Sequence, residues 1–173
     1  MARGRAAMPL TGFQRRLLAD LGATPNDERY LAGGAALHFA PNSIRCSDDL
    51  DFFHDSEARV AAAFAADSTR LGSLGYRVDV ELSLPGFVRA IVARREEATR
   101  IDWAHDSAWR FMPLVRDTLG GLLLHPVDLA VNKVLALAGR DEARDFVDIL
   151  FVHDRVLALP ALTWAARCRC WNC

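Results

Sequence analysis

Two aspartates share one short apolar segment, in which Asp49-Leu50-Asp51 is followed by Phe52-Phe53. In a β-strand, side chains alternate, so Asp49 and Asp51 would point to one face and Leu50 to the other. Like charges this close repel one another, and burying them without a partner is costly. A divalent cation relieves both penalties, and magnesium commonly takes one or two carboxylates together with substrate phosphates. The alternative is an edge strand whose acids face water, which is the commoner explanation of an isolated D-x-D pattern.

A third acid, Asp102, lies in the apolar segment 100–103. On a neighbouring strand, Asp102 would complete a carboxylate cluster for two metal ions, one on a triphosphate and one on an attacking hydroxyl. Asp102 would also be able to orient or deprotonate that hydroxyl. A solvated edge acid is again the alternative. Asp106 and Asp117 compete for the same role, but neither lies inside an apolar strand.

The pair Gly33-Gly34 stands between a short apolar segment and a helical one. Without Cβ atoms, such a turn lets backbone amides approach a phosphate group closely. Paired glycines are more often plain turn residues. The short spacing from this pair to Ser47, Asp49 and Asp51 nevertheless favours a phosphate and metal site.

The helical part of the sequence contributes a lysine and two acids. Lys133 is the single lysine in a chain with twenty arginines, and it lies among apolar helical positions. Arg140, seven residues later, is expected on the same face, while Asp145 and Asp148 are three apart and share a face of the next helix. Lys133 would suit a phosphate, and the two acids would fix basic groups or bind a base. A solvated charged face would explain Arg140 and Arg144 equally well.

The elements that must position these residues alternate between helix and strand. Apolar periodicity predicts helices over residues 12–22, 35–40, 56–71, 127–138 and 142–153. It predicts strands over residues 29–32, 49–53, 76–84, 87–94, 100–103, 112–116 and 121–124. This order predicts an α+β fold with a mixed β-sheet, flanking helices and a helical C-terminal part. Residues 1–125 would form the α/β core, with residues 126–173 packed on the same domain.

Composition and charge narrow the class of protein. The 173 residues are 51% hydrophobic and 25% charged, as in one folded domain. The net charge of −1 gives no basic field, so any RNA contact needs a local patch. No apolar run approaches the ~20 residues of a membrane span, and no signal peptide is visible, so no membrane partner and a cytoplasmic location are expected.

Three of the four cysteines, Cys168, Cys170 and Cys173, crowd the last six residues, and Cys46 is remote. A structural zinc site uses about four ligands, so the sequence favours an irregular tail over a metal clip. A truncated end or a shifted reading frame would also explain this segment.

Four segments together are similar to a known family. They are G-G-A-A-L (33–37), R-x-S-x-D-L-D-F (45–52), I-D (101–102) and K-x6-R-x3-R-D-x2-D (133–148). The chain resembles the AbiEii/AbiGii-type nucleotidyltransferases, toxins of bacterial type IV toxin–antitoxin systems within the DNA polymerase β-like superfamily. The resemblance covers about residues 28–153. Its first part is shared across the superfamily, and the last segment is more specific to this branch.

The resemblance implies a nucleotidyltransferase fold and transfer of NMP from an NTP to an acceptor hydroxyl, with Mg²⁺ or Mn²⁺ as cofactor. A tRNA 3′ end or a protein would be the acceptor, and a cognate antitoxin would be a partner. Family members often continue with more helices than this chain has after the last motif. By position the resemblance assigns metal binding to Asp49, Asp51 and Asp102. It assigns catalysis to the same three acids and to Lys133. The residues that it implies for nucleotide binding are Gly33, Gly34, Arg45, Ser47, Lys133, Asp145 and Asp148.

Two other functions stay open at this stage. The first is a catalytically inactive module of the same fold that binds nucleotide or a partner protein. The second is an HD-type metal phosphohydrolase, suggested by the His-Asp pairs at 54–55, 105–106 and 153–154. That motif needs its histidines on helices, whereas the first two pairs follow predicted strands.

Overall fold

The computed structural model describes residues 10–23, 29–39, 46–119, 121–140 and 142–171. Within these ranges, seven strands form one sheet in the order β3-β4-β5-β2-β1-β7-β6. The strands are β1 (Tyr30–Ala32), β2 (Asp49–His54), β3 (Arg77–Leu84), β4 (Phe87–Arg94), β5 (Glu97–His105), β6 (Val115–Asp117) and β7 (Gly121–Leu123). The helices are α1 (Gly12–Gly22), α2 (Gly33–Leu37), α3 (Glu57–Ser73), α4 (Pro126–Gly139), α5 (Ala143–Arg155) and α6 (Leu159–Trp171).

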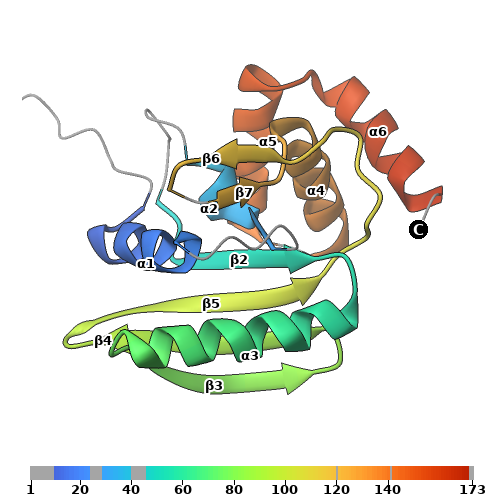
Figure 1. Cartoon of the computed structure of the whole chain (residues 1–173). Coiled ribbons are helices and arrows are strands. Elements are labelled where there is room, and N and C mark those ends of the chain that lie inside the picture. Colours follow the sequence, from blue (N-terminus) through green and yellow to red (C-terminus); the bar gives the residue numbers. More distant parts are fainter. Residues whose placement is uncertain (1–9, 24–28, 40–45, 120, 141, 172–173) are drawn as a thin grey trace, which may run out of the picture.

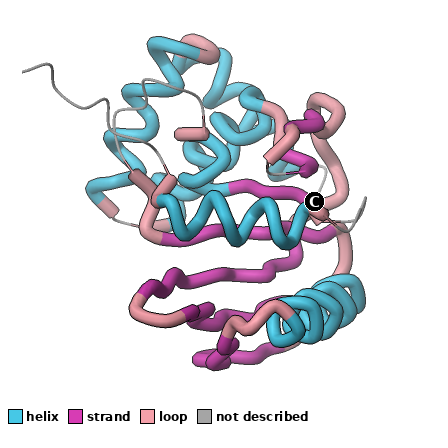
Figure 2. The backbone as a smooth tube through the Cα atoms, turned by 60° about the vertical axis from the view of Figure 1, so that its left-hand side comes forward, coloured by secondary structure: helices cyan, strands magenta, loops and turns pink. Residues whose placement is uncertain are grey.

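The sheet is mixed, as the sequence predicted. The central strand β2 runs parallel to β5 and antiparallel to β1, and β1 runs parallel to β7. Helix α3 lies along the β3-β4-β5 half of the sheet, and α4, α5 and α6 gather at the other end (Figure 1). The turned view in Figure 2 shows one helix at the lower end of the strands and a group of helices at the opposite end.

Side-chain alternation divides the two central strands between a core face and an open face. Leu50 and Phe52 of β2, like Ile101 and Trp103 of β5, are at most 1% exposed. Trp103 packs edge-on against Phe64 of α3, which places these apolar side chains on the α3 face. The residues between them must therefore point to the opposite face of the sheet.

Helix α1 supports the start of β2 from a neighbouring position. A reciprocal capping box between Thr11 and Gln14 fixes its first turn. The buried Gln14 amide then donates to the Ser47 carbonyl at 3.0 Å and to the Thr99 hydroxyl at 3.2 Å. These bonds tie the segment that precedes Asp49 to the beginning of β5.

The largest departure from the sequence prediction is the end of α6, because Cys168 and Cys170, which were expected in an irregular tail over the last six residues, lie in this helix. Its buried side chains, Leu162, Ala165, Ala166 and Arg169, follow helical spacing, and the helix packs on α4. Cys168 and Cys170 lie on this helix and Cys46 precedes β2, whereas Cys173 lies outside the described residues. The irregular-tail prediction was wrong for residues 168–171, because the buried face of this helix has only four residues and is interrupted by arginines and cysteines.

Two smaller corrections affect the helices near the cavity. Helix α2 ends at Leu37 rather than near residue 40, and His38 follows it as the C-cap. Arg140 does not share a face of α4, because it lies one residue beyond the helix in an extended conformation. None of the helices in the described ranges is long and apolar enough to cross a membrane.

Candidate active site

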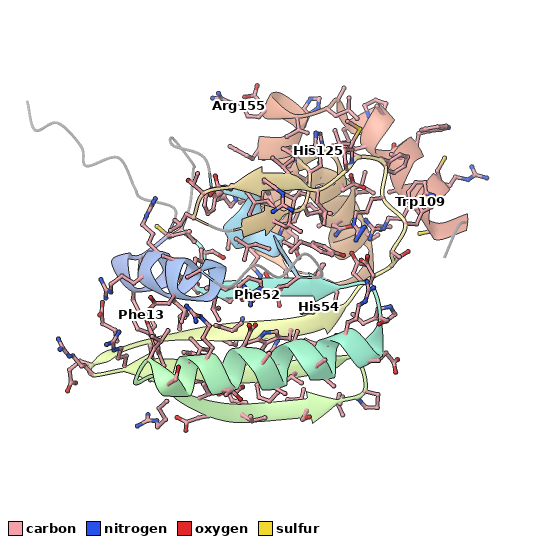
Figure 3. The ribbon with its side chains drawn as sticks, in the orientation of Figure 1. Phe13, Phe52, His54, Trp109, His125 and Arg155 are labelled. Carbon is pink, nitrogen blue, oxygen red and sulfur yellow. The ribbon has the colours of Figure 1, made fainter. Side chains whose placement is uncertain are left out.

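The register between β2 and β5 brings the three predicted carboxylates together. Asp51 is the direct partner of Asp102, and Asp49 is the partner of Arg100. Neighbouring strands lie about 4.8 Å apart, so Asp51 and Asp102 stand side by side with Asp49 one pleat away. All three line a cavity of about 530 Å³ on the open face of the sheet. Phe52 and His54, labelled on β2 in Figure 3, alternate with this row of acids.

The opposite wall of the cavity comes from the helical part. Lys133 and Ala136 of α4 line it, as do Gly33 and Gly34 at the start of α2. Basic side chains outnumber acidic ones in this lining, which suits a polyanionic ligand. The basic residues are Arg89, Arg100, Lys133, Arg140, Arg144 and Arg169, and the acidic ones are Asp49, Asp51, Asp102 and Asp106.

Gly33 is required at its position for two independent reasons. Its φ of +61° is a left-handed conformation that residues with a side chain rarely adopt. A Cβ atom at Gly33 would also lie 1.8 Å from Oδ2 of Asp51. The backbone at Gly33 therefore lies directly against the Asp51 carboxylate. Any larger residue at position 33 would displace either this turn or the Asp51 side chain.

The outer two carboxylates are each held by an arginine. Asp49 pairs with Arg100 and accepts a hydrogen bond from the Ser47 hydroxyl at 3.2 Å. Asp102 accepts two bonds from Arg89, at 2.9 Å from Nε and 2.6 Å from Nη2. Burial alone would raise the pKa of Asp49, but the hydrogen bond and charge of Arg100 lower it below its usual value.

The central carboxylate, Asp51, differs from the outer two because no arginine binds it in the described part of the chain. No hydrogen bond or ion pair to Asp51 is found among the described residues. Burial, followed by the charges of Asp49 and Asp102, raises the pKa of Asp51 to about 6. In the described part of the chain, no three His, Cys, Asp or Glu side chains are already gathered around a metal position. Because Arg100 and Arg89 hold the two outer carboxylates, a cation would have to compete with these guanidinium groups.

Asp51→Asn should stabilise the metal-free protein above pH 6. The folded-state pKa of about 6 exceeds the ordinary value of 3.8, so folding loses stability as the pH rises between these values. Asparagine removes that loss, which is on the order of 3 kcal/mol, or several degrees of melting temperature. Thermal melts in EDTA should show the gain at pH 8 and none near pH 3.5. An unchanged or lower melting temperature at pH 8 would contradict the strained carboxylate.

The helical residues form a buried ion-pair group beside the cavity. The Lys133 ammonium lies 2.7 Å from Oδ2 of Asp148 and 3.4 Å from Oδ1 of Asp145. Arg140 binds Asp145 through Nε at 2.6 Å, and His38 lies 2.8 Å from Asp148. Both acids are fully buried. Burial would raise the pKa of Asp145, but Arg140 and Lys133 lower it.

The predicted nucleotide-binding residues therefore divide into two sets. Gly33, Gly34 and Lys133 line the cavity. Ser47 is 2% exposed and reaches Asp49 rather than the cavity, and Asp145 and Asp148 lie behind Lys133, where they fix basic groups. Arg45 lies outside the described residues.

Several residues of the site had no role in the sequence prediction. Arg89 and His38 carry no local signal in the sequence, because strand pairing and helix packing create their contacts. Arg169 of α6 donates to Asn132 at 2.5 Å and to Asp106 at 2.7 Å, which closes one end of the cavity. Asp106, which competed with Asp102 as the predicted third carboxylate, forms an ion pair with Arg169.

The His-Asp pairs do not form a common centre. His54 and His105 are the last residues of β2 and β5 and are partners in the sheet, so neither histidine lies on a helix. The third pair lies on α5, where His153 and Asp154 are exposed.

No protein-family model matches the chain, and no curated protein is similar to it in sequence. Solved structures are similar in fold. A candidate nucleotidyltransferase from Helicobacter pylori superposes with a TM-score of 0.61 at 18% identity, covering 82% of this chain. This chain spans 65% of the length of that protein. The Megavirus polyadenylate synthase gives a TM-score of 0.59 at 13% identity, covering 82% of this chain and 31% of that one.

A third structure matches over nearly its whole length. The antibiotic-resistance factor ANT(2'')-Ia gives a TM-score of 0.59 at 14% identity, covering 92% of this chain and 94% of that one. Identities this low establish the fold and leave substrate and activity open. The chain has the nucleotidyltransferase fold.

Proposed function

We propose that the protein transfers a nucleoside monophosphate from an NTP to an acceptor hydroxyl. The observation that carries this proposal is the placement of Asp49, Asp51 and Asp102 on adjacent parallel strands, facing a cavity whose other wall presents Lys133. Phosphoryl transfer of this kind depends on positioning and on stabilising negative charge, and this arrangement serves both needs.

The residues present fit a divalent metal such as Mg²⁺ or Mn²⁺. The donors are carboxylate oxygens, which these ions prefer, and burial together with the charges of Asp49 and Asp102 raises the pKa of Asp51, a repulsion that a bound cation would relieve. Asp49, Asp51 and Asp102 would hold the metal. When bound, it would supply charge that neutralises the triphosphate and activates the acceptor hydroxyl.

The remaining residues would act on the nucleotide and the acceptor. The turn at Gly33 and Gly34 leaves room for phosphate oxygens next to Asp51, since no side chain intervenes. Lys133 would place a compact positive charge against the departing pyrophosphate. Asp102 is half of an ion pair with Arg89, and on release it would accept or orient the proton of the acceptor hydroxyl.

The finer assignment follows the resemblance of the motifs to AbiEii-type toxins. On that basis the acceptor is a tRNA 3′ end or a protein, and the protein is the toxin of a type IV toxin–antitoxin pair. The arginine-rich cavity supports a phosphate-bearing acceptor over an uncharged one.

A second candidate is a nucleotide-binding module of the same fold without turnover. One observation favours it: Arg100 and Arg89 already neutralise two of the three carboxylates.

The two candidates are separated by incubation with each α-³²P-labelled NTP, Mg²⁺ or Mn²⁺, total RNA and the protein itself. Covalent label in RNA or in protein is expected. Label that stays entirely in free nucleotide, while nucleotide binding is measurable by calorimetry, would replace the transferase with the binding module.

A further inference from the structure

His38 is a buried polar residue at the junction between the glycine turn and the helical wall of the cavity. It follows α2 directly, so only five helical residues separate it from β1. The side chain is fully buried, and its ring packs against Phe151 of α5 with the centroids 5.0 Å apart. An apolar residue would suit such surroundings, so the presence of an imidazole needs a reason.

The reason lies in one carboxylate that is shared between His38 and Lys133. Oδ1 of Asp148 is 2.8 Å from Nε2 of His38, and Oδ2 of the same group is 2.7 Å from the Lys133 ammonium. Because Asp148 is fully buried, its two oxygens have no water to rotate toward. The direction of the carboxylate plane, set on one side by His38, therefore determines where Lys133 is held on the other.

The hydrogen on the imidazole can be assigned from its partners. A carboxylate only accepts hydrogen bonds, so Nε2 carries the hydrogen and donates it to Asp148. Nδ1 of His38 is buried and has no hydrogen-bond partner in the described part of the chain. An unpaired buried nitrogen destabilises the fold. Nδ1 of His38 therefore destabilises the core. The hydrogen bond from Nε2 to Asp148 is the contact that explains a histidine at this position.

We propose that His38 is a positioning residue, which directs the Lys133 ammonium into the cavity through Asp148 and so couples α2 to α4. This inference rests on the proposed function, in which Lys133 contacts the polyphosphate of the nucleotide. Lys133 lines the cavity with 9% of its side chain exposed, and its ammonium contacts both Asp145 and Asp148. A small tilt of Asp148 would draw the ammonium away from the cavity.

Binding measurements with the full chain test this role. Each of the four NTPs and the corresponding nucleosides are titrated calorimetrically with Mg²⁺ at pH 8. His38→Leu should weaken binding of the preferred NTP about tenfold and change nucleoside binding less than twofold, because only the polyphosphate contacts Lys133. Equal weakening for NTP and nucleoside would overturn the proposal in favour of a purely structural role.

Two conservative variants keep the test decisive if the leucine variant fails to fold. A glutamine amide nitrogen takes the place of Nε2, whereas an asparagine nitrogen falls at the place of Nδ1. His38→Gln should bind the NTP within about twofold of wild type, and His38→Asn should resemble the leucine variant. Equal NTP affinities for the glutamine and asparagine variants would overturn the proposal.

A double-mutant cycle identifies the route of the effect. In the background of Lys133→Gln, His38→Asn should add less than twofold to the loss, since the lysine it positions is gone. Val152→Ala is the matched control, because Val152 is buried on the same helix as Asp148. It should lower the melting temperature and leave the ratio of NTP to nucleoside affinity unchanged. A full tenfold effect of His38→Asn without Lys133 would overturn the coupling.

The same data separate this inference from the proposed function. Wild-type protein that binds no NTP contradicts the proposed function itself, whereas Lys133→Gln that binds as well as wild type removes Lys133 from the site and overturns the role of His38 with it. Loss of NTP binding in Lys133→Gln but not in His38→Asn contradicts only the role of His38.

Discussion

Asp51→Asn is expected to lower nucleotide transfer at least about a thousandfold, while the protein stays folded. Asp51 lies between the other two carboxylates, beside Asp102 on β5 and one pleat from Asp49 on β2. Asparagine has nearly the same shape, so Gly33 and the sheet register need not move. It loses the negative charge that a divalent cation would neutralise, and an amide is a much weaker ligand for a hard ion.

Two measurements check this expectation. Incorporation of labelled NMP reports activity, and electron paramagnetic resonance of bound Mn²⁺ reports metal affinity independently of turnover. The matched control is Asp79→Asn, the same chemical change at an exposed strand residue whose ion pair within the described ranges is with Arg77. It should leave both quantities within about twofold of wild type. Retention of more than a tenth of the activity in Asp51→Asn would remove Asp51 from the metal site.

Measuring thermal stability together with activity distinguishes a local effect at Asp51 from damage to the fold. The same substitution that abolishes transfer should raise the melting temperature of the metal-free protein at pH 8, because the raised pKa of Asp51 marks an unfavourable charge. Substitutions that act by damaging the fold lower both activity and stability. Opposite changes in the two quantities would therefore locate the effect at the site.

The row of acids could be predicted from the sequence because it depends on local rules. Alternation along β2 puts Asp49 and Asp51 on one face, and Leu50 and Phe52 fill the core behind them. The left-handed turn at Gly33 was likewise visible as paired glycines between a strand and a helix. Each of these features needs only a few consecutive residues to be recognised.

The cation partners of these acids could not be predicted, since they depend on register. Arg89 reaches Asp102 because the β4–β5 hairpin makes them direct partners, and that register depends on a turn in which Arg95 has a positive φ. A shift of one residue would point Arg89 into the core. Arginines are common in this chain, so nothing in the sequence distinguishes Arg89 from its neighbours.

The contribution of α6 to the cavity could not be predicted from the sequence for a different reason. Arg169 reaches Asn132 and Asp106 only because α6 folds back on α4, a contact between segments 37 residues apart. Its buried face has only four residues, and Pro160 at its start reads as a loop signal as readily as a helix start. Tertiary packing therefore decides this element.

Lys133→Arg is expected to keep the protein folded and to lower kcat/KM for transfer about ten- to a hundredfold. The Lys133 ammonium lies between two fully buried carboxylates, 2.7 Å from Asp148 and 3.4 Å from Asp145. A guanidinium group is wider and planar, and it would need two acceptors in its own plane. Asp145 already binds the fork of Arg140 through both oxygens, so an arginine at position 133 would have to turn toward the cavity or displace that pair.

The reverse substitution provides the control. Arg77→Lys exchanges the same two side-chain types at a position outside the cavity whose side chain is 74% exposed, so solvent screens the change and the effect should stay within about twofold. Both variants retain positive charge, so any difference between them reports shape and placement. If Lys133 only extended from the helix toward water, arginine would replace it freely, with rate and affinity within about twofold of wild type, or ~0.5 kcal/mol. That result would remove Lys133 from the site and leave the three carboxylates as the sole support for nucleotidyl transfer.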